Sequence, residues 1–456
     1  MSTARAAALV LCLASTLPAG LDAQTSLTIY NDGRVLVRRT IALALPKGSS
    51  AQRVTLGALD PASLFSLDSM VTIDGLTYDG AVDEGSVLRR SVGRRVVFRL
   101  PETTDTVSAL VLGVDPLRLQ LPDGRVSFSP PGAAMYPGDV VVADPTASLR
   151  LTSRRATDRL RLGYFTAGAA WRASYQVVLG PGEARVSGGA VVESQTLRAE
   201  EAELQLLAGA VSRAEEAPRP PMPLQEARMA AAVAYDKVAT EQRVGEFHLY
   251  SLPGRTTLLP GLTSTIALFA PAGVKYERSY VVHGQVPWWG MLPQQGDETQ
   301  VPVEVFYTLQ RPRKTEFGDR PLPGGVVRLF QTDSAGRAQL VGEATMDHTA
   351  AGENVRLSAG TAFDLTARRS QTSYVTRRDS TKAGPRTEAT AGYRVTIRNA
   401  SDTAATVEVR EERAGEWSVI DSSVPPEKLS STVTRFRVKV PARGETVLTY
   451  RVRAVW

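Results

Sequence analysis

The sequence predicts an all-β protein made of two or three packed β-sandwich domains, the C-terminal one immunoglobulin-like. Two observations predict this fold class. Apolar and polar residues alternate along most of the 456 residues, which is typical of strands with one buried face. Turns rich in Gly, Pro and Asp separate these short strands at regular intervals, as they do in sandwiches.

Residues 1–23 show the pattern of a secretory signal peptide. Arg5 precedes an apolar run at 6–17, and Ala23 is the small residue before an expected cleavage at Gln24. Cys12 is the one cysteine of the sequence and lies inside this segment, so the mature chain would contain neither a disulfide nor a thiolate metal site. The mature chain has no second apolar run of about 20 residues, so we expect no transmembrane helix in it.

Residues 24–150 are expected to form an N-terminal β-rich domain. Its clearest element is a β-hairpin, in which residues 27–30 and 34–38 alternate on either side of Asn31-Asp32-Gly33. These turn residues tolerate the positive φ angles that a tight hairpin requires. Further short strands are expected near 53–56, 70–73, 96–100 and 117–121.

Residues 151–385 are expected to form a central β domain with a flexible insertion. The insertion at 213–243 is rich in Pro and Ala, and its prolines cannot join a central strand because they lack the backbone N–H donor. The polar and basic segment 372–386 is expected to be a long hairpin loop or linker. Strands are expected at 171–177, 184–196, 245–252, 264–269 and 275–282.

Residues 386–456 are expected to form the C-terminal β-sandwich portion, packing with the central domain. Residues 393–398 alternate, 399–402 form a turn, and 405–410 alternate back. Two further strands follow at 433–440 and 446–456. This spacing of short strands and turns is what predicts the immunoglobulin type.

The balance of charge argues against a nucleic-acid partner. The sequence has 53 Lys and Arg against 47 Asp and Glu, a formal net charge of +6. The arginines are scattered along strands, as in Arg38-Arg39 and Arg89-Arg90, and form no basic stripe. Solvated sheet faces account for this charge. The alternative is a weak peripheral association with anionic lipids or wall polymers.

The sequence predicts no catalytic, cofactor-binding or metal-ligating residues, and no cofactor. The three histidines, His248, His283 and His348, lack the spacing of a metal motif. Neither the G-x-S-x-G turn of α/β hydrolases nor a phosphate-binding glycine loop is present. Asp79, Asp83 and Glu84 surround a glycine turn without the ligand spacing of a calcium loop. We therefore expect that the protein is not an enzyme.

Trp288 and Trp289 are the most informative local feature. Adjacent residues of an extended chain point to opposite sides, so at most one of the two rings enters a core on a simple strand. The flanking Pro287 and Gly290 favour a loop. Packing between domains is one interpretation. The other is an exposed contact for a ligand or partner, in which the rings stack on sugar or protein surfaces.

Several runs of the sequence resemble a known bacterial family. The first group is 317–330 (FGDRPLPGGVVRLF), 341–343 and 360–364 (GTAFD); the second is 30–34, 171–175, 407–411 and 448–452. Together they resemble the mucoidy inhibitor A-like family, exported β-rich proteins with a C-terminal domain of unknown function. The resemblance covers about 160–456, and 24–100 more loosely. It implies a short variant without the family's coiled coil, and it assigns no catalytic or binding residue.

These observations predict an exported protein in the periplasm or on the outer surface of a Gram-negative-type bacterium. We expect a binding or scaffolding role without catalysis, and an envelope protein or polysaccharide as the partner. The alternative function is that of a carbohydrate-binding or carbohydrate-active protein, which uses an exposed loop with Trp288 and Trp289.

Overall fold

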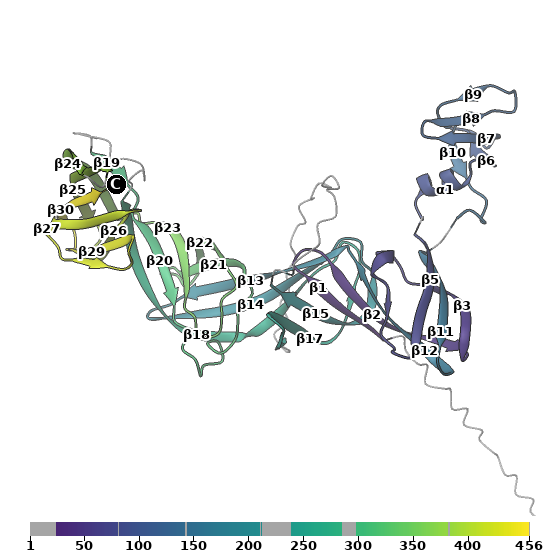
Figure 1. Ribbon diagram of the computed structural model, residues 1–456, viewed down its shortest axis with the longest axis horizontal. Coiled ribbons are helices and arrows are strands. Elements are labelled where there is room, and N and C mark those ends of the chain that lie inside the picture. Colours follow the sequence, from purple (N-terminus) through teal and green to yellow (C-terminus); the bar gives the residue numbers. More distant parts are fainter. Residues whose placement is uncertain are drawn as a thin grey trace, which may run out of the picture. The chain divides into compact units, whose positions relative to one another are not determined.

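The computed structural model describes residues 24–80, 82–141, 144–209, 211, 239–284, 298–381 and 384–455. Their regular structure is almost entirely β-strand in packed sheets, so the predicted all-β class is confirmed (Figure 1). Neither helix in these ranges has the length and apolar character to cross a bilayer. The predicted signal peptide at 1–23 and most of the predicted insertion at 213–243 lie outside the described residues.

The described residues divide into two compact units. The first contains the chain up to Ala170 with Ser194–Gln205 and Gly254–Leu262, and the second contains the rest. Each unit is therefore assembled from separate stretches of sequence. The domain boundaries predicted near residues 150 and 385 stay predictions.

The largest sheet of the first unit has one apolar face. Its strands lie in the order β15-β1-β2-β12-β4. Leu27 pairs with Val37, which confirms the predicted hairpin at 27–38, and Tyr164 lies opposite Val37 on the other side. These three side chains are buried on one face of the sheet. The strands are β1 (Thr25–Tyr30), β2 (Val35–Leu45), β4 (Phe65–Ser66), β12 (Thr157–Thr166) and β15 (Ala199–Ala208).

Two smaller sheets belong to the same unit, with the orders β3-β11-β5 and β10-β6-β7-β8-β9. The helix α1 (Glu84–Arg90) begins at Asp83, whose side chain accepts a hydrogen bond from the Ser86 N–H (2.9 Å) and so caps it. Leu88 of α1 packs against the core of the five-stranded sheet. The elements are β3 (Gly48–Thr55), η1 (Pro61–Ser63), β5 (Val71–Asp79), β6 (Arg95–Arg99), β7 (Thr106–Val114), β8 (Leu117–Gln120), β9 (Val126–Ser127), β10 (Ala133–Met135) and β11 (Thr146–Ser153).

The second unit contains one strand of 22 residues, β18 (Thr263–Gly284). The sequence predicts two strands here, at 264–269 and 275–282. They are continuous because Pro271 lies at a bulge, where the register against β14 shifts and no ladder N–H is required. Its first half pairs with β14, and its second half pairs with β20 and β26.

The remaining strands around β18 form a branched sheet. The main path is β22-β21-β13-β14-β18-β26-β29-β28, and β20 with β23 branches from β18. The strands β16 (Thr240–Val244) and β17 (Phe247–Leu258) pair as an antiparallel hairpin, and β16 begins inside the predicted insertion. The others are β13 (Ala169–Leu179), β14 (Glu183–Ser194), β20 (Glu304–Leu309), β21 (Gly325–Thr332), β22 (Ala338–Met346), β23 (Val355–Thr361), β26 (Ala405–Glu412), β28 (Pro426–Lys428) and β29 (Val433–Val440).

A second sheet packs on the end of this one to form a sandwich, with the order β19-β24-β25-β30-β27. Side chains of both layers share one core, which includes Val282, Val409, Phe436, Val395 and Leu448. The sandwich is thus present, and its immunoglobulin-like character stays a prediction. The strands are β19 (Thr299–Val301), β24 (Leu365–Thr381), β25 (Gly384–Asn399), β27 (Glu416–Ser422) and β30 (Glu445–Val455).

Two local expectations for this region are wrong. The segment 372–386 is not a loop in its described part, because β24 and β25 stay paired from Leu365 opposite Asn399 to Thr381 opposite Gly384. The strand at 405–410 does not return along 393–398. The chain crosses between layers after Asn399, and β26 pairs with β18 and β29 in the opposite sheet.

A buried ionic cluster lies between the two layers. Glu411 has an exposed fraction of 0% and accepts hydrogen bonds from Arg369 (2.9 Å), Arg413 (3.2 Å) and the Tyr450 hydroxyl. The Arg369 guanidinium also lies over the Tyr393 ring, 4.0 Å from its centroid. Burial, together with the charge of Glu411, raises the pKa of Tyr450 well above its ordinary value, so this hydroxyl stays a donor.

Replacing Glu411 tests this cluster. Glu411→Gln leaves two buried arginines without their counterion, so we expect the free energy of unfolding to fall by about 3–5 kcal/mol. Urea denaturation followed by circular dichroism and tryptophan fluorescence measures the change. Glu427→Gln is the matched control. It removes the exposed carboxylate that pairs with Arg435 (2.7 Å) and should change stability far less than Glu411→Gln does. Equal losses in both variants would contradict a special role for the buried cluster.

The stability of the protein is expected to depend on pH through Tyr136, which packs against the core of the five-stranded sheet. Partial burial and the nearby Glu84 carboxylate raise the pKa of Tyr136 to about 12. The Tyr136 hydroxyl donates a hydrogen bond to this carboxylate, with 3.2 Å between the two oxygens. The unfolded chain loses this proton near pH 10, so the contribution to stability falls as pH rises from about 10 to about 12. The difference in tyrosinate absorbance between the unaltered protein and Tyr136→Phe measures this pKa. Glu84→Gln should lower it, and an unchanged titration would refute the assignment.

Candidate functional site

The structure does not gather the residues singled out from the sequence into one site. Trp288 and Trp289 lie outside the described residues, so their role as a ligand or partner contact stays a prediction. Within the described ranges, no group of three or more His, Cys, Asp or Glu side chains could hold a metal ion. Each histidine has its own partner: His248 with Glu241 (2.7 Å), His283 with Glu304 (3.8 Å), and His348 Nδ1, which accepts from the Gly324 N–H (3.0 Å).

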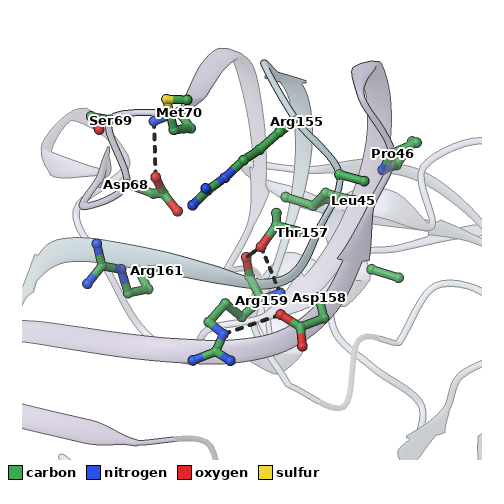
Figure 2. A pocket seen from close by; sticks show the side chains of 12 residues that line it. Leu45, Pro46, Asp68, Ser69, Met70, Arg155, Thr157, Asp158, Arg159 and Arg161 are labelled. Carbon is green, nitrogen blue, oxygen red and sulfur yellow. Dashed lines mark hydrogen bonds and ion pairs between the residues drawn. The ribbon is translucent and has the colours of Figure 1, made fainter.

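The first candidate site is a pocket of about 1120 Å³ in the first unit, called here the arginine pocket. It is lined by the end of β2, the turn at Asp68, and the start of β12 with the residues before it. Figure 2 shows Arg155 extending into the pocket toward Asp68, with Arg159 and Arg161 beside it. The three arginines are exposed, so the pocket is open to solvent.

The charges of the arginine pocket are only partly compensated. Arg159 pairs with Asp158 (3.3 Å), and Arg161 donates to the Leu67 carbonyl (3.2 Å). Asp68 accepts from the Met70 N–H (3.0 Å) within its own turn. The Arg155 guanidinium makes no hydrogen bond or ion pair within the described part of the chain. Three arginines against two aspartates leave an excess of one positive charge, and Arg155 is the group available to an anion.

The second candidate site is a smaller pocket of about 250 Å³ in the second unit, called here the aromatic groove. Tyr280 on β18, Tyr307 on β20 and Phe363 line it, together with Arg278 and Asp364. Phe363 has an exposed fraction of 96%, an unusual position for so large an apolar side chain. The Arg278 guanidinium lies 5.3 Å from the centroid of the Tyr280 ring.

The polar groups of the aromatic groove are available for hydrogen bonds. Within the described residues, the Tyr280 and Tyr307 hydroxyls have no protein partner. Burial raises the pKa of Tyr280, so its hydroxyl remains protonated and able to donate. Aromatic faces beside a guanidinium, a carboxylate and hydroxyls can hold a polar ring-shaped ligand.

A buried arginine explains the position of the motif at 317–330. Arg311 has an exposed fraction of 0%, and its guanidinium donates only to backbone carbonyls. The Tyr175 and Tyr250 hydroxyls donate to the carbonyls of Pro323 (2.7 Å) and Pro321 (3.1 Å). This loop is therefore held through its backbone. The four carbonyls that accept from Arg311 are those of Phe317, Arg320, Ala350 and Glu353.

Sequence reasoning missed both pockets, although each left a signal. Arg159 and Arg161 are two residues apart on β12 and share one face, so a pair of cations on a strand was visible. Arg155 and Asp68 are far apart in sequence and meet only through the fold. Phe363 lies in the run 360–364 between Ala362 and Asp364, and its near-complete exposure appears only in the fold.

Comparison with known proteins does not assign either pocket. No protein-family model matches the chain, and no curated protein matches it. The chemistry of the two pockets is therefore argued from their own residues. The resemblance of 317–330 and 360–364 to the mucoidy inhibitor A-like family stays a prediction.

Proposed function

We propose that the chain is an exported cell-envelope β-sandwich protein that acts by binding, not by catalysis, and that the arginine pocket contacts an acidic envelope polysaccharide. The signal-peptide pattern at 1–23 supports export. The runs at 171–175 and 317–330 resemble the mucoidy inhibitor A-like family, whose members are exported. This resemblance also supports export, and it supports a short variant of that family. A location in the periplasm or on the outer surface fits both.

The arginine pocket carries this proposal. Arg155 projects into an open space beside Arg159 and Arg161, and it has no acidic partner of its own among the described residues. A guanidinium presents paired N–H donors that match the two oxygens of a carboxylate. The pocket is wide and exposed. Such a pocket can contact one segment of a long polymer, but it does not enclose a small molecule. Repeated carboxylates on such a polymer would also benefit from the positive net charge of the chain.

Removing the pocket cations tests the proposal. We expect the purified chain to bind polygalacturonate, a polymer of repeated carboxylates, and to bind neutral dextran far more weakly. Arg155→Gln combined with Arg159→Gln should lower the affinity for polygalacturonate about tenfold, because charge-assisted hydrogen bonds are lost. Affinity electrophoresis at two salt concentrations measures this, and added salt should weaken binding.

Arg154→Gln is the matched control. Arg154 is the exposed neighbour of Arg155 and does not line the pocket, so its loss should leave the affinity almost unchanged. If Arg154→Gln lowered the affinity for polygalacturonate as much as the double Arg155→Gln/Arg159→Gln variant does, the effect would be one of net charge and would contradict a specific site. Shortening of the polymer by the protein would contradict the non-catalytic part of the proposal.

A second function, carbohydrate binding through the aromatic groove, is favoured by the exposure of Phe363. An apolar ring at the lip of a pocket with Arg278 and Asp364 can stack on a sugar face while the charged groups bind hydroxyls. Carbohydrate binding is also the alternative function that the sequence predicted. There the aromatic surface was the loop with Trp288 and Trp289, whereas here it is the groove with Phe363.

Phe363→Ala tests this alternative. Losing one stacked ring should weaken binding of cellohexaose or soluble wall fragments by about 1 kcal/mol, or roughly fivefold in affinity. Isothermal titration calorimetry measures the change. Phe128→Ala is the control, since Phe128 is also exposed (66%) but lies outside the groove. If the unaltered chain binds none of these sugars, or the Phe363 variant binds them equally well, the groove is not a carbohydrate site.

A further inference from the structure

A third pocket lies in the first unit and encloses about 450 Å³; it is called here the Arg39 pocket. Buried side chains form its floor: Leu27, Val37, Leu56 and Tyr164. Exposed residues form its mouth: Ala58, Ala167, Thr196, Arg198 and Glu200. This volume falls within the range of about 300–1,000 Å³ that small-molecule sites occupy. The pocket shares no lining residue with the arginine pocket.

Arg39 interrupts the apolar floor. On β2 it follows Val35 and Val37 on the same face of the sheet, and it lies opposite Thr25 on β1 and Leu162 on β12. An apolar residue would suit this position better than a cation, because Val35, Val37 and Leu162 on this face are buried and apolar.

The Arg39 guanidinium is incompletely satisfied. Its Nη1 donates to the Thr55 carbonyl (3.2 Å), while its Nε is buried and has no hydrogen-bond partner. Within the described residues, no carboxylate forms an ion pair with it. The arginine at the mouth differs in this respect, because Arg198 already pairs with Glu200 (2.6 Å). The pocket therefore combines an apolar floor with one half-buried cation that has no ion-pair partner among the described residues.

We propose that the Arg39 pocket binds a single-chain amphiphile with a carboxylate head group. The carboxylate supplies the negative charge that the Arg39 guanidinium lacks, and it accepts hydrogen bonds from the terminal N–H groups of that side chain. The hydrocarbon chain lies on the floor of Leu27, Val37 and Leu56 and leaves water, which favours binding through the hydrophobic effect. Tyr164 is already engaged, since its hydroxyl donates to the Leu56 carbonyl (2.9 Å) and accepts from the Arg39 side chain, so Arg39 is the group that selects the head group.

Calorimetric titration of the full chain with three probes tests this proposal. Decanoate, kept below its micellar concentration, should bind at one site per chain. Decan-1-ol, with the same tail and no charge, should bind about tenfold more weakly, and acetate, with the head group alone, should give no measurable binding. Arg39→Met should lower decanoate affinity about tenfold and leave decan-1-ol affinity almost unchanged.

Two further variants keep the test decisive. Arg154→Gln removes an exposed cation outside the pocket and should leave decanoate binding unchanged. Ala58→Phe fills the mouth from an exposed loop position, and it should weaken both decanoate and decan-1-ol even if Arg39→Met fails to fold. Circular dichroism checks the fold of each variant. The proposal would be overturned if the unaltered chain did not bind decanoate, or if it bound decanoate and decan-1-ol equally well. It would also be overturned if Ala58→Phe, or an Arg39→Met variant that folds, bound decanoate as tightly as the unaltered chain does.

Discussion

The second unit depends on the backbone hydrogen bonds of β18. Every buried N–H and C=O needs a partner, and this one strand supplies partners to β14 along its first half and to β20 and β26 along its second. At 22 residues it is far longer than the usual strand of about 5–6. The bulge at Pro271 allows the register to shift without breaking the strand. The first layer of the sandwich is therefore a continuation of the central sheet.

The arginines of this chain serve three different purposes that a net charge cannot separate. Arg369 and Arg413 neutralise a buried carboxylate inside the sandwich, where removal of one partner leaves an isolated charge. Arg311 is equally buried but donates only to neutral carbonyls. Arg155 is exposed and free to meet an external anion. The first two uses are structural.

The alternation of side chains was enough to predict strands and the hairpin at 27–38, because a two-residue period and a tight turn are local properties. Pairing could not be predicted in the same way. Between β25 and β30 the chain crosses several times from one sheet to the facing one, and a half-buried strand has the same pattern whichever neighbour it pairs with. The pockets could not be predicted from the sequence for a related reason. Arg39 appears in the sequence as one of two adjacent surface arginines, and only the register shows that it faces the apolar side.

The anchoring of the loop at 317–323 has a consequence for acid tolerance. Arg311 keeps its charge at any pH that a cell meets, and none of its four carbonyl acceptors can be protonated in that range. A loop tied down by carboxylates would loosen as the medium acidifies, whereas this one keeps every bond to Arg311. The anchoring of the loop by Arg311 is therefore independent of pH over the range in which carboxylates gain protons.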